Sequence, residues 1–257
     1  MRRGFRRSRS TPCARCAPSR QEHDLQWNNL VTQLFGSYHG MRVAGDFIQG
    51  EVMFDGEPLA VIGTTNHAPI GVQLALAQAR VVLDTMSEHP GRPILLLIDT
   101  QGQQLRRRDE LLGINRAMAH LGMSIDLARR RGHRVIGLVY DQALSGGFIT
   151  SGLIADACFA LPEAEIRVMR IPAMARVTKL PEDRLTALSQ SNPVFAPGVG
   201  NYVAMGGVRA LWEGDLQNAL RDALADTPTQ DTRAADGARR GGRLLAAAVA
   251  QRVLDAA

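Results

Sequence analysis

Two apolar runs constrain the fold of this chain more than any other feature. Each has the length of a buried strand and leads into a loop that contains glycine: Ile94–Ile98 precedes Asp99-Thr-Gln-Gly102, and Arg134–Tyr140 precedes Asp141-Gln-Ala-Leu-Ser-Gly-Gly147. Continuous apolar runs are typical of strands covered on both faces. Because helical patterns separate them, the sequence predicts an α/β or α+β layered fold with one main core.

The other segments complete the expected order of elements. We expect a hairpin of 51–54 and 58–63 around Asp55-Gly56, followed by a buried helix over 70–86. The next helix should end at Gly132 and carry on one face Leu111, Ile114, Met118, Leu121 and Ile125. Further along we expect helix-like residues 148–155, short apolar runs at 157–161 and 166–171, and an amphipathic helix over 209–225. Residues 226–242 are polar and rich in Gly and Arg, so a mobile segment and a short Ala-rich helix are expected to end the chain.

Charge is concentrated in the N-terminal segment. The net charge is +5, but residues 1–20 hold seven Arg and no acid, and the other 237 residues carry 23 basic and 25 acidic side chains. With only 5% aromatic residues, neither a nucleic-acid surface nor a stacking platform is expected. No stretch approaches the roughly 20 consecutive apolar residues of a membrane span, so a membrane protein is excluded.

The same basic segment leaves several interpretations open. Its composition fits an organelle transit peptide, but a disordered arm over 1–23 is favoured, which precedes a globular domain at 24–225 and a tail at 226–257. A zinc site at Cys13 and Cys16 would need His23 or an outside ligand. The odd count of three cysteines argues against a disulfide framework and fits a reducing cytoplasm.

The sharpest local feature is Leu144-Ser145-Gly146-Gly147, between a buried strand and a helix start. Amides of Gly146 and Gly147 at a helix N-terminus can stabilise an oxyanion or enolate. The alternative is that the small residues only let the helix pack tightly on the sheet. A Ser-acid-His nucleophile elbow is excluded because all six histidines precede Ser145.

Three other positions remain ambiguous from sequence alone. The run Arg106-Arg107-Arg108 could contact phosphates, although such runs are more often solvated. His67 follows a strand and could belong to a site, but a hydrogen-bonded structural histidine is favoured. Lys179, the only lysine, fits a surface charge as well as it fits a role in a site. The chain has no Gly-rich nucleotide-binding motif.

These loops resemble a known family, the gamma subunit of biotin-independent malonate decarboxylase, which is akin to acyl-CoA carboxyltransferase halves. The residues that carry the resemblance are 66–71 (NHAPIG), 97–103 (LIDTQGQ), 105–113 (LRRRDELLG), 138–148 (LVYDQALSGGF), 161–169 (LPEAEIRVM), 172–176 (PAMAR) and 191–198 (SNPVFAPG). They cover about residues 50–225, and the segments before Asp24 and after Ala225 lie outside them.

The resemblance implies a crotonase-like fold of repeated ββα units with peripheral helices. It implies a beta subunit of similar fold, with the active site at the interface between the two subunits. It further implies decarboxylation of malonyl-S-acyl-carrier-protein to the acetyl thioester and carbon dioxide in the cytoplasm. The implied partners also include the acyl carrier protein and its transferase. The substrate would be carried on a phosphopantetheine-type prosthetic group, with no cofactor bound directly, no biotin and no metal.

By motif, the resemblance places the oxyanion-binding pair on Gly146 and Gly147. The candidate substrate-binding residues are Ser145, Gln142, Gly102, Arg106, Arg107 and Arg108; the compact arginine run next to Gly102, in a body otherwise near neutral, is expected to bind the phosphorylated arm of a carrier protein. One departure stands at Arg170, where related sequences tend to have Gly; if that position needs a positive φ or lies near substrate, the pocket changes. Two alternatives remain. The chain could be a scaffolding subunit that shapes its partner's pocket. It could also be a self-sufficient acyl-CoA hydratase or hydrolase that uses Glu163 or Glu165.

Overall fold

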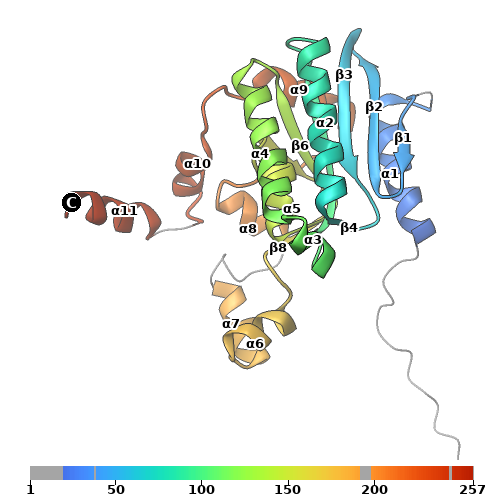
Figure 1. The fold of residues 1–257 in the computed structure, drawn as a ribbon. Coiled ribbons are helices and arrows are strands. Elements are labelled where there is room, and N and C mark those ends of the chain that lie inside the picture. Colours follow the sequence, from blue (N-terminus) through green and yellow to red (C-terminus); the bar gives the residue numbers. More distant parts are fainter. Residues whose placement is uncertain (1–19, 38, 192–197, 243–244, 257) are drawn as a thin grey trace, which may run out of the picture.

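The computed structural model describes residues 20–37, 39–191, 198–242 and 245–256. Its centre is an eight-stranded mixed sheet with the main order β1-β2-β3-β5-β6-β7, in which β4 pairs with β5 and β8 with β6 (Figure 1). The strands are β1 (Arg42–Ala44), β2 (Phe47–Phe54), β3 (Glu57–Thr64), β4 (Ala68–Ile70), β5 (Ile94–Gln103), β6 (Val135–Leu144), β7 (Ala157–Ala160) and β8 (Glu165–Arg167).

Helices cover both faces of this sheet. They are α1 (Arg20–Phe35), α2 (Val72–Glu88), α3 (Arg107–Leu111), α4 (Ile114–Arg130), α5 (Ser145–Phe148), which continues into the π-helix η1 (Ile149–Leu153), α6 (Ile171–Thr178), α7 (Glu182–Ser191), α8 (Val199–Ala204), α9 (Leu216–Asp226), α10 (Arg233–Arg239) and α11 (Ala246–Asp255). In Figure 1, α2 and α4 lie side by side over one face, while α6, α7 and α11 extend away from the sheet.

The two long central strands bury side chains on both faces, as the apolar runs predicted. In β5, Leu95 and Leu97 belong to the core that packs against α1 and α9, whereas Ile94 and Leu96 belong to the core beneath α2 and α4. Burial of alternate residues on opposite faces follows from the two-residue period of a strand. The unbroken apolar pattern of 94–98 therefore has a direct structural cause.

Both central strands also serve two parts of the sheet. The first half of β5 pairs with β3 and its second half with β4. On its other side β5 pairs with β6, and the register of that pairing shifts between Ile98 and Thr100. The first half of β6 pairs with β7 and its second half with β8. The units β3-β4-α2, β5-α4, β6-α5 and β7-β8-α6 therefore repeat one ββα plan, and each changes strand or ladder partner near its middle, at a point that we call its bend. This arrangement confirms the expected repeated units.

Several local predictions are confirmed. β2 and β3 form the antiparallel hairpin, and its turn residues Asp55 and Gly56 have φ of 51° and 85°. Such angles are those of a type I′ hairpin turn, which Asp-Gly favours. Gly132, with φ of 87°, follows the end of α4, and α11 is the expected Ala-rich terminal helix.

Other boundaries differ from the predictions. Leu111 does not lie on the buried face of α4: it ends the short α3 and is 77% exposed, because Gly113, with φ of 76°, separates the two helices. Strand β6 continues to Leu144, through residues expected to form a loop, because β8 supplies its ladder partners. The expected helix over 209–225 begins at Leu216, where Asp215 accepts hydrogen bonds from two first-turn amides.

Residues 226–242, expected to be mobile, contain α10. The side chains of Arg233 and Arg240 donate hydrogen bonds to backbone carbonyls of the main body, including Ala155 at 3.1 Å and Val203 at 2.8 Å. These partners are distant in sequence, so a polar composition gave no sign of them.

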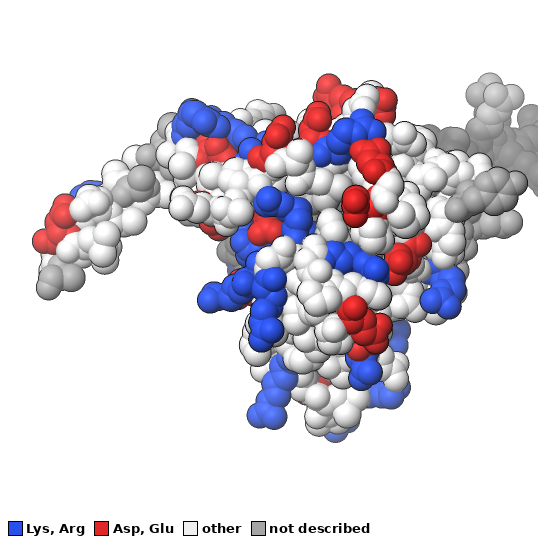
Figure 2. Space-filling model, turned by 90° about the horizontal axis from the view of Figure 1, so that it is seen from above, with Lys and Arg blue, Asp and Glu red and all other residues white. Residues whose placement is uncertain are grey.

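The face of the molecule drawn in Figure 2 agrees with the near-neutral body inferred from sequence. In the view of Figure 2, acidic and basic side chains both occur across the visible face. Among the described helices, none has the length and apolar character needed to cross a membrane.

Candidate active site

The start of α5 presents backbone amides at the end of β6. Ser145 turns the chain with φ of 51°, and no side chain caps the helix. Helix geometry leaves the first-turn amides, those of Ser145, Gly146 and Gly147, without intrahelical partners. The partial positive charge of a helix N-terminus adds to their ability to hold an anion. This end of α5 can therefore stabilise a developing negative charge.

Gly102 and Gly147 bring β5 and α5 into backbone contact. A Cβ on Gly147 would stand 2.9 Å from the Gly102 Cα and 3.0 Å from the Thr100 Oγ1. The Gly102 amide donates to Thr100 Oγ1 at 3.0 Å, so that amide already has a partner. Tight packing, the alternative left open by the sequence, thus applies to Gly147. Gly146 differs, because its Cβ would meet only the Met118 Cε, at 3.7 Å.

Ser145 and Gln142 both face the segment that follows β8. The Ser145 hydroxyl donates to the Val168 carbonyl, and the Gln142 Oε1 accepts from Arg170 Nη2 at 3.5 Å. Arg170 has φ of −70°, so the departure from Gly imposes no backbone strain here. Ser145 is therefore occupied in holding the start of α5 against the chain that enters α6.

Arg106, Arg107 and Arg108 are all exposed at the start of α3. Arg106 and Arg108 line a groove of about 430 Å³ together with Pro69, Gln104 and Leu112. The neighbouring Asp109 accepts a hydrogen bond from the Val72 amide at 2.9 Å, so it caps α2. Asp109 therefore has a structural role, whereas the three arginines before it face solvent.

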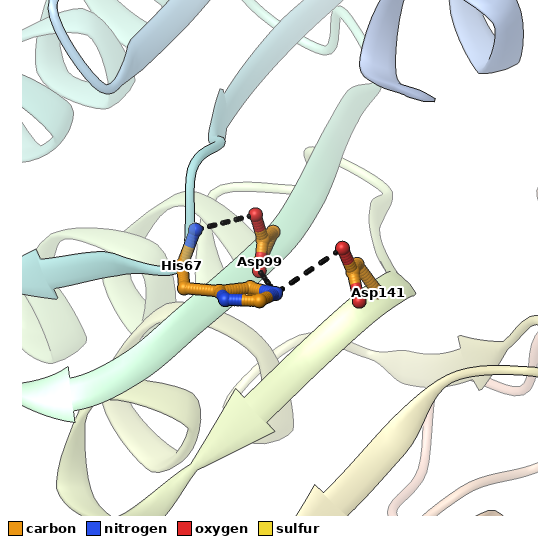
Figure 3. A group of neighbouring side chains, drawn as sticks. All are labelled: His67, Asp99 and Asp141. Atoms are coloured by element: carbon orange, nitrogen blue, oxygen red, sulfur yellow. Dashed lines mark hydrogen bonds and ion pairs between the residues drawn. The ribbon is translucent and has the colours of Figure 1, made fainter. Parts of the chain in front are cut away.

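Three titratable side chains converge at the bends of successive units, as Figure 3 shows. His67 lies in the turn between β3 and β4, Asp99 in the bend of β5 and Asp141 in β6. The His67 amide donates to Asp99 Oδ2 at 2.7 Å, and His67 Nε2 lies 3.3 Å from Asp141 Oδ2 and 3.7 Å from Asp99 Oδ1. We call these three residues the bend cluster.

Burial shapes the protonation of the bend cluster. Desolvation raises the pKa of Asp99 to about 7, against the opposing effects of the charge and backbone amide of His67. Burial would lower the pKa of His67, but the hydrogen bond to Asp141 and the charges of Asp99 and Asp141 outweigh it and raise that pKa. Perturbed groups of this kind gather at functional sites more often than elsewhere.

The bend cluster was not predicted from the sequence. A usable signal exists, because Asp99 and Asp141 each follow an apolar strand at the same point of the repeat. Carboxyl ends of neighbouring parallel strands meet at one edge, which would have placed the two acids side by side. His67, for which the sequence left a structural role and a site role open, lies at the corresponding point of the preceding unit, between β3 and β4.

Of the remaining candidates, Glu165 lies in β8 directly opposite Gln142 of β6. Glu165 is paired with Arg167. Burial and the nearby charge of Arg170 lower the pKa of Arg167 to about 10. Glu163 is exposed in the turn before β8, and Lys179 is exposed at the end of α6. Cys13 and Cys16 fall outside the described residues.

Comparisons with known proteins point in one direction. A family model described as "Malonate decarboxylase gamma subunit" matches residues 65–257. The match begins after residue 50, where the resemblance was expected to start, and extends beyond Ala225, where it was expected to end. Over 194 residues the chain is 31% identical to the malonyl-S-ACP:biotin-protein carboxyltransferase MADD of Malonomonas rubra. The match covers 68% of this chain and 66% of that relative's length.

Solved structures are similar over most of the chain. A Pseudomonas malonate decarboxylase hetero-tetramer in complex with coenzyme A contains a chain with a TM-score of 0.73 at 25% identity, over 88% of this chain and 97% of that one. The Pseudomonas MdcD–MdcE hetero-dimer gives 0.71 at 25% identity, over 90% and 98%. Transcarboxylase 12S, at 18% identity and a TM-score of 0.67 over 85% of this chain and 46% of that one, shares the fold. The crotonase-like fold is thereby confirmed.

Proposed function

Because this chain belongs to the malonate decarboxylase gamma-subunit family, we propose that it acts with a beta subunit to decarboxylate malonyl-S-acyl-carrier-protein. The products are acetyl-S-acyl-carrier-protein and carbon dioxide, formed in the cytoplasm. An acyl-carrier-protein subunit and its transferase complete the proposed set of partners. The resemblance to an MdcD–MdcE hetero-dimer supports the pairing with a beta subunit.

The observation that carries the mechanism is the uncapped start of α5. Decarboxylation breaks the bond between the malonyl α-carbon and its carboxylate, which leaves as carbon dioxide, and the electron pair moves onto the thioester as an enolate. A proton from water then adds to the α-carbon and gives the acetyl thioester. Amide N–H groups of Gly146 and Gly147 would donate to the enolate oxygen. Such fixed donors require no reorganisation as the charge develops, and the loss of one costs on the order of a hundredfold or more in rate.

The Arg106–Arg108 run is proposed to bind the phosphate of the carrier's prosthetic group. All three side chains are exposed, and two of them line the groove beside β4. Guanidinium groups bind phosphate oxygens through charge-assisted hydrogen bonds. Gly102, which packs against Gly147, lies in the strand that leads into this run, so the run and the start of α5 both adjoin the end of β5.

A second candidate function comes from the relative MADD, whose name describes carboxyl transfer from malonyl-S-ACP to a biotin protein. The two reactions share the enolate and differ in the fate of the carboxyl group. Decarboxylation releases carbon dioxide, whereas transfer leaves the carboxyl group on biotin.

One experiment separates these functions. The purified chain, with and without a beta subunit, is mixed with malonyl-S-acyl-carrier-protein carrying a labelled free carboxyl group, in the presence and absence of a biotin protein. We expect labelled carbon dioxide and acetyl thioester only when both subunits are present. Turnover by the chain alone would favour a self-sufficient enzyme, and label on biotin would favour transfer.

A variant pair tests the amides within the reconstituted complex. Gly146→Val should lower kcat about a hundredfold, because the side chain would occupy the space in which substrate meets the amides. Gly200→Val is the matched control: Gly200 is an exposed helical glycine, and a Cβ there meets no atom within 4 Å. Full activity of a folded Gly146→Val complex would contradict the proposed role and favour a scaffolding subunit.

A further inference from the structure

The bend cluster joins three parts of the chain that are distant in sequence. His67, Asp99 and Asp141 belong to consecutive ββα units, and one ligand-type atom from each lies within 4.8 Å of the other two. Their donors are one imidazole nitrogen and two carboxylate oxygens. The arrangement is open to solvent on one side, because the His67 and Asp141 side chains are each 24% exposed.

Hydrogen bonding alone does not satisfy this cluster. His67 Nε2 can carry one proton, and it lies within hydrogen-bond distance of Asp141 Oδ2 but 3.7 Å from Asp99 Oδ1. The Asp99 side chain is only 1% exposed, and its Oδ1 atom has no hydrogen-bond partner. A buried carboxylate oxygen without a partner is costly, and buried carboxylates are normally paired or coordinate a metal ion.

We propose that His67, Asp99 and Asp141 form a binding site for a divalent metal ion, and a donor set of one imidazole and two carboxylates is compatible with Zn²⁺. Tetrahedral ligands at about 2.1 Å from Zn²⁺ stand about 3.4 Å from one another. The observed separations from His67 Nε2 are 3.3 and 3.7 Å. Asp99 Oδ1, which has no hydrogen-bond partner, would become a ligand of the ion, and water would fill the fourth position on the exposed side.

The charges balance once the ligands are deprotonated. Two ionised carboxylates and a neutral imidazole carry two negative charges, which one divalent ion neutralises. Ligation requires the deprotonated carboxylate, so binding the ion would compete with the proton that burial favours on Asp99. The site extends the chemistry expected from the sequence, where no metal was expected, and it does not depend on the proposed decarboxylation.

A competing arrangement uses no metal. A protonated His67 could stand between the two carboxylates, with Arg170 as the other positive group near the imidazole. In that arrangement the cluster is an ion-pair network that ties the three bends together. The two arrangements differ in measurable zinc content and in the effect of zinc on thermal unfolding.

The test uses the full chain with Cys13→Ser and Cys16→Ser in every sample, so that these two thiols cannot bind zinc. After chelator treatment and dialysis, zinc binding is measured by titration calorimetry and by metal analysis of the gel-filtered protein. The variants are Asp99→Asn and Asp141→Asn, which keep side-chain shape while weakening a ligand. His120→Gln, at an exposed position on α4, is the matched histidine control.

We expect one zinc ion per chain and a rise in Tm on zinc addition, because a ligand that binds only the folded state stabilises it. Each Asn variant should bind at least tenfold more weakly, with a Tm in chelator close to that of the parent, whereas His120→Gln should bind as the parent does. A folded parent that takes up no zinc at micromolar concentration would overturn the proposal. Zinc binding by both Asn variants that is as tight as binding by the parent would overturn it as well.

Discussion

The Gly102 Cα lies 2.9 Å from the point that a Cβ on Gly147 would occupy, so the end of β5 and the start of α5 meet backbone to backbone. Gly102 also has φ of 98°, which L side chains rarely adopt. Both glycines are therefore required by geometry. This contact fixes where the α5 amides lie relative to the loop that leads to the arginine run.

Gly147→Ala should destabilise the fold by about 1–3 kcal/mol, because the added methyl group has no space against the Gly102 backbone. Gly146→Ala should be tolerated much better, since its Cβ would meet only the end of a flexible methionine. Urea unfolding of the two variants beside the parent measures the difference. Equal stability of the two variants would contradict the close contact between Gly102 and Gly147.

Ser145→Ala should keep activity in the reconstituted complex within about tenfold of the parent. The hydroxyl donates to the Val168 carbonyl, so its loss removes one structural hydrogen bond rather than a nucleophile, at a cost of about 1 kcal/mol. Steady-state kinetics and a thermal melt check both parts. A folded variant without activity would mean that the hydroxyl takes part in the chemistry.

Replacing Arg106, Arg107 and Arg108 together by Gln should raise KM for the carrier-linked substrate far more than it lowers kcat. The side chains are exposed, so stability should change little, and Asp109 should be left intact because it caps α2. Arg130→Gln with Arg131→Gln, also exposed, provides a control that removes two positive charges elsewhere on the surface. An unchanged KM would mean that the run does not bind the carrier's phosphate.

Cys158 should resist alkylation in the folded protein. The residue is 3% exposed, and burial raises the pKa of its thiol to about 12. The reactive thiolate is therefore almost absent at pH 8, and access is blocked. Mass spectrometry after iodoacetamide treatment, with and without denaturant, should show modification of Cys158 only in denaturant.

The sequence predicted the strands and helices whose cause is local. The apolar runs of β5 and β6 and the Asp55-Gly56 turn need only their own residues to be recognised. The elements that the sequence did not predict depend on hydrogen bonds to residues far away in the chain. β6 extends to Leu144 because β8 pairs with it, and α10 packs through carbonyls far away in the chain.

The candidate site was predictable to a similar extent. Gly146, Gly147 and Gly102 could be singled out because each lies in a short segment directly after a buried strand, where a missing side chain leaves the backbone accessible. The contact between Gly102 and Gly147 could not be predicted, since it depends on how two repeats pack. The bend cluster required three repeats to be superimposed, and its members are separated by 32 and 42 positions along the chain.

The division of β5 between two sets of ladder partners has a consequence for how this protein can change. The register shift between Ile98 and Thr100 absorbs a mismatch in strand length at one point. Insertion or deletion of one residue beyond that point would reverse which side chains face inward only in the outer half of the strand. Such a change would re-aim Gly102 and the amides it adjoins while the packing of Ile94–Ile98 stayed intact. Small length changes beyond the bend would therefore move the α5 amides without rebuilding the hydrophobic interior.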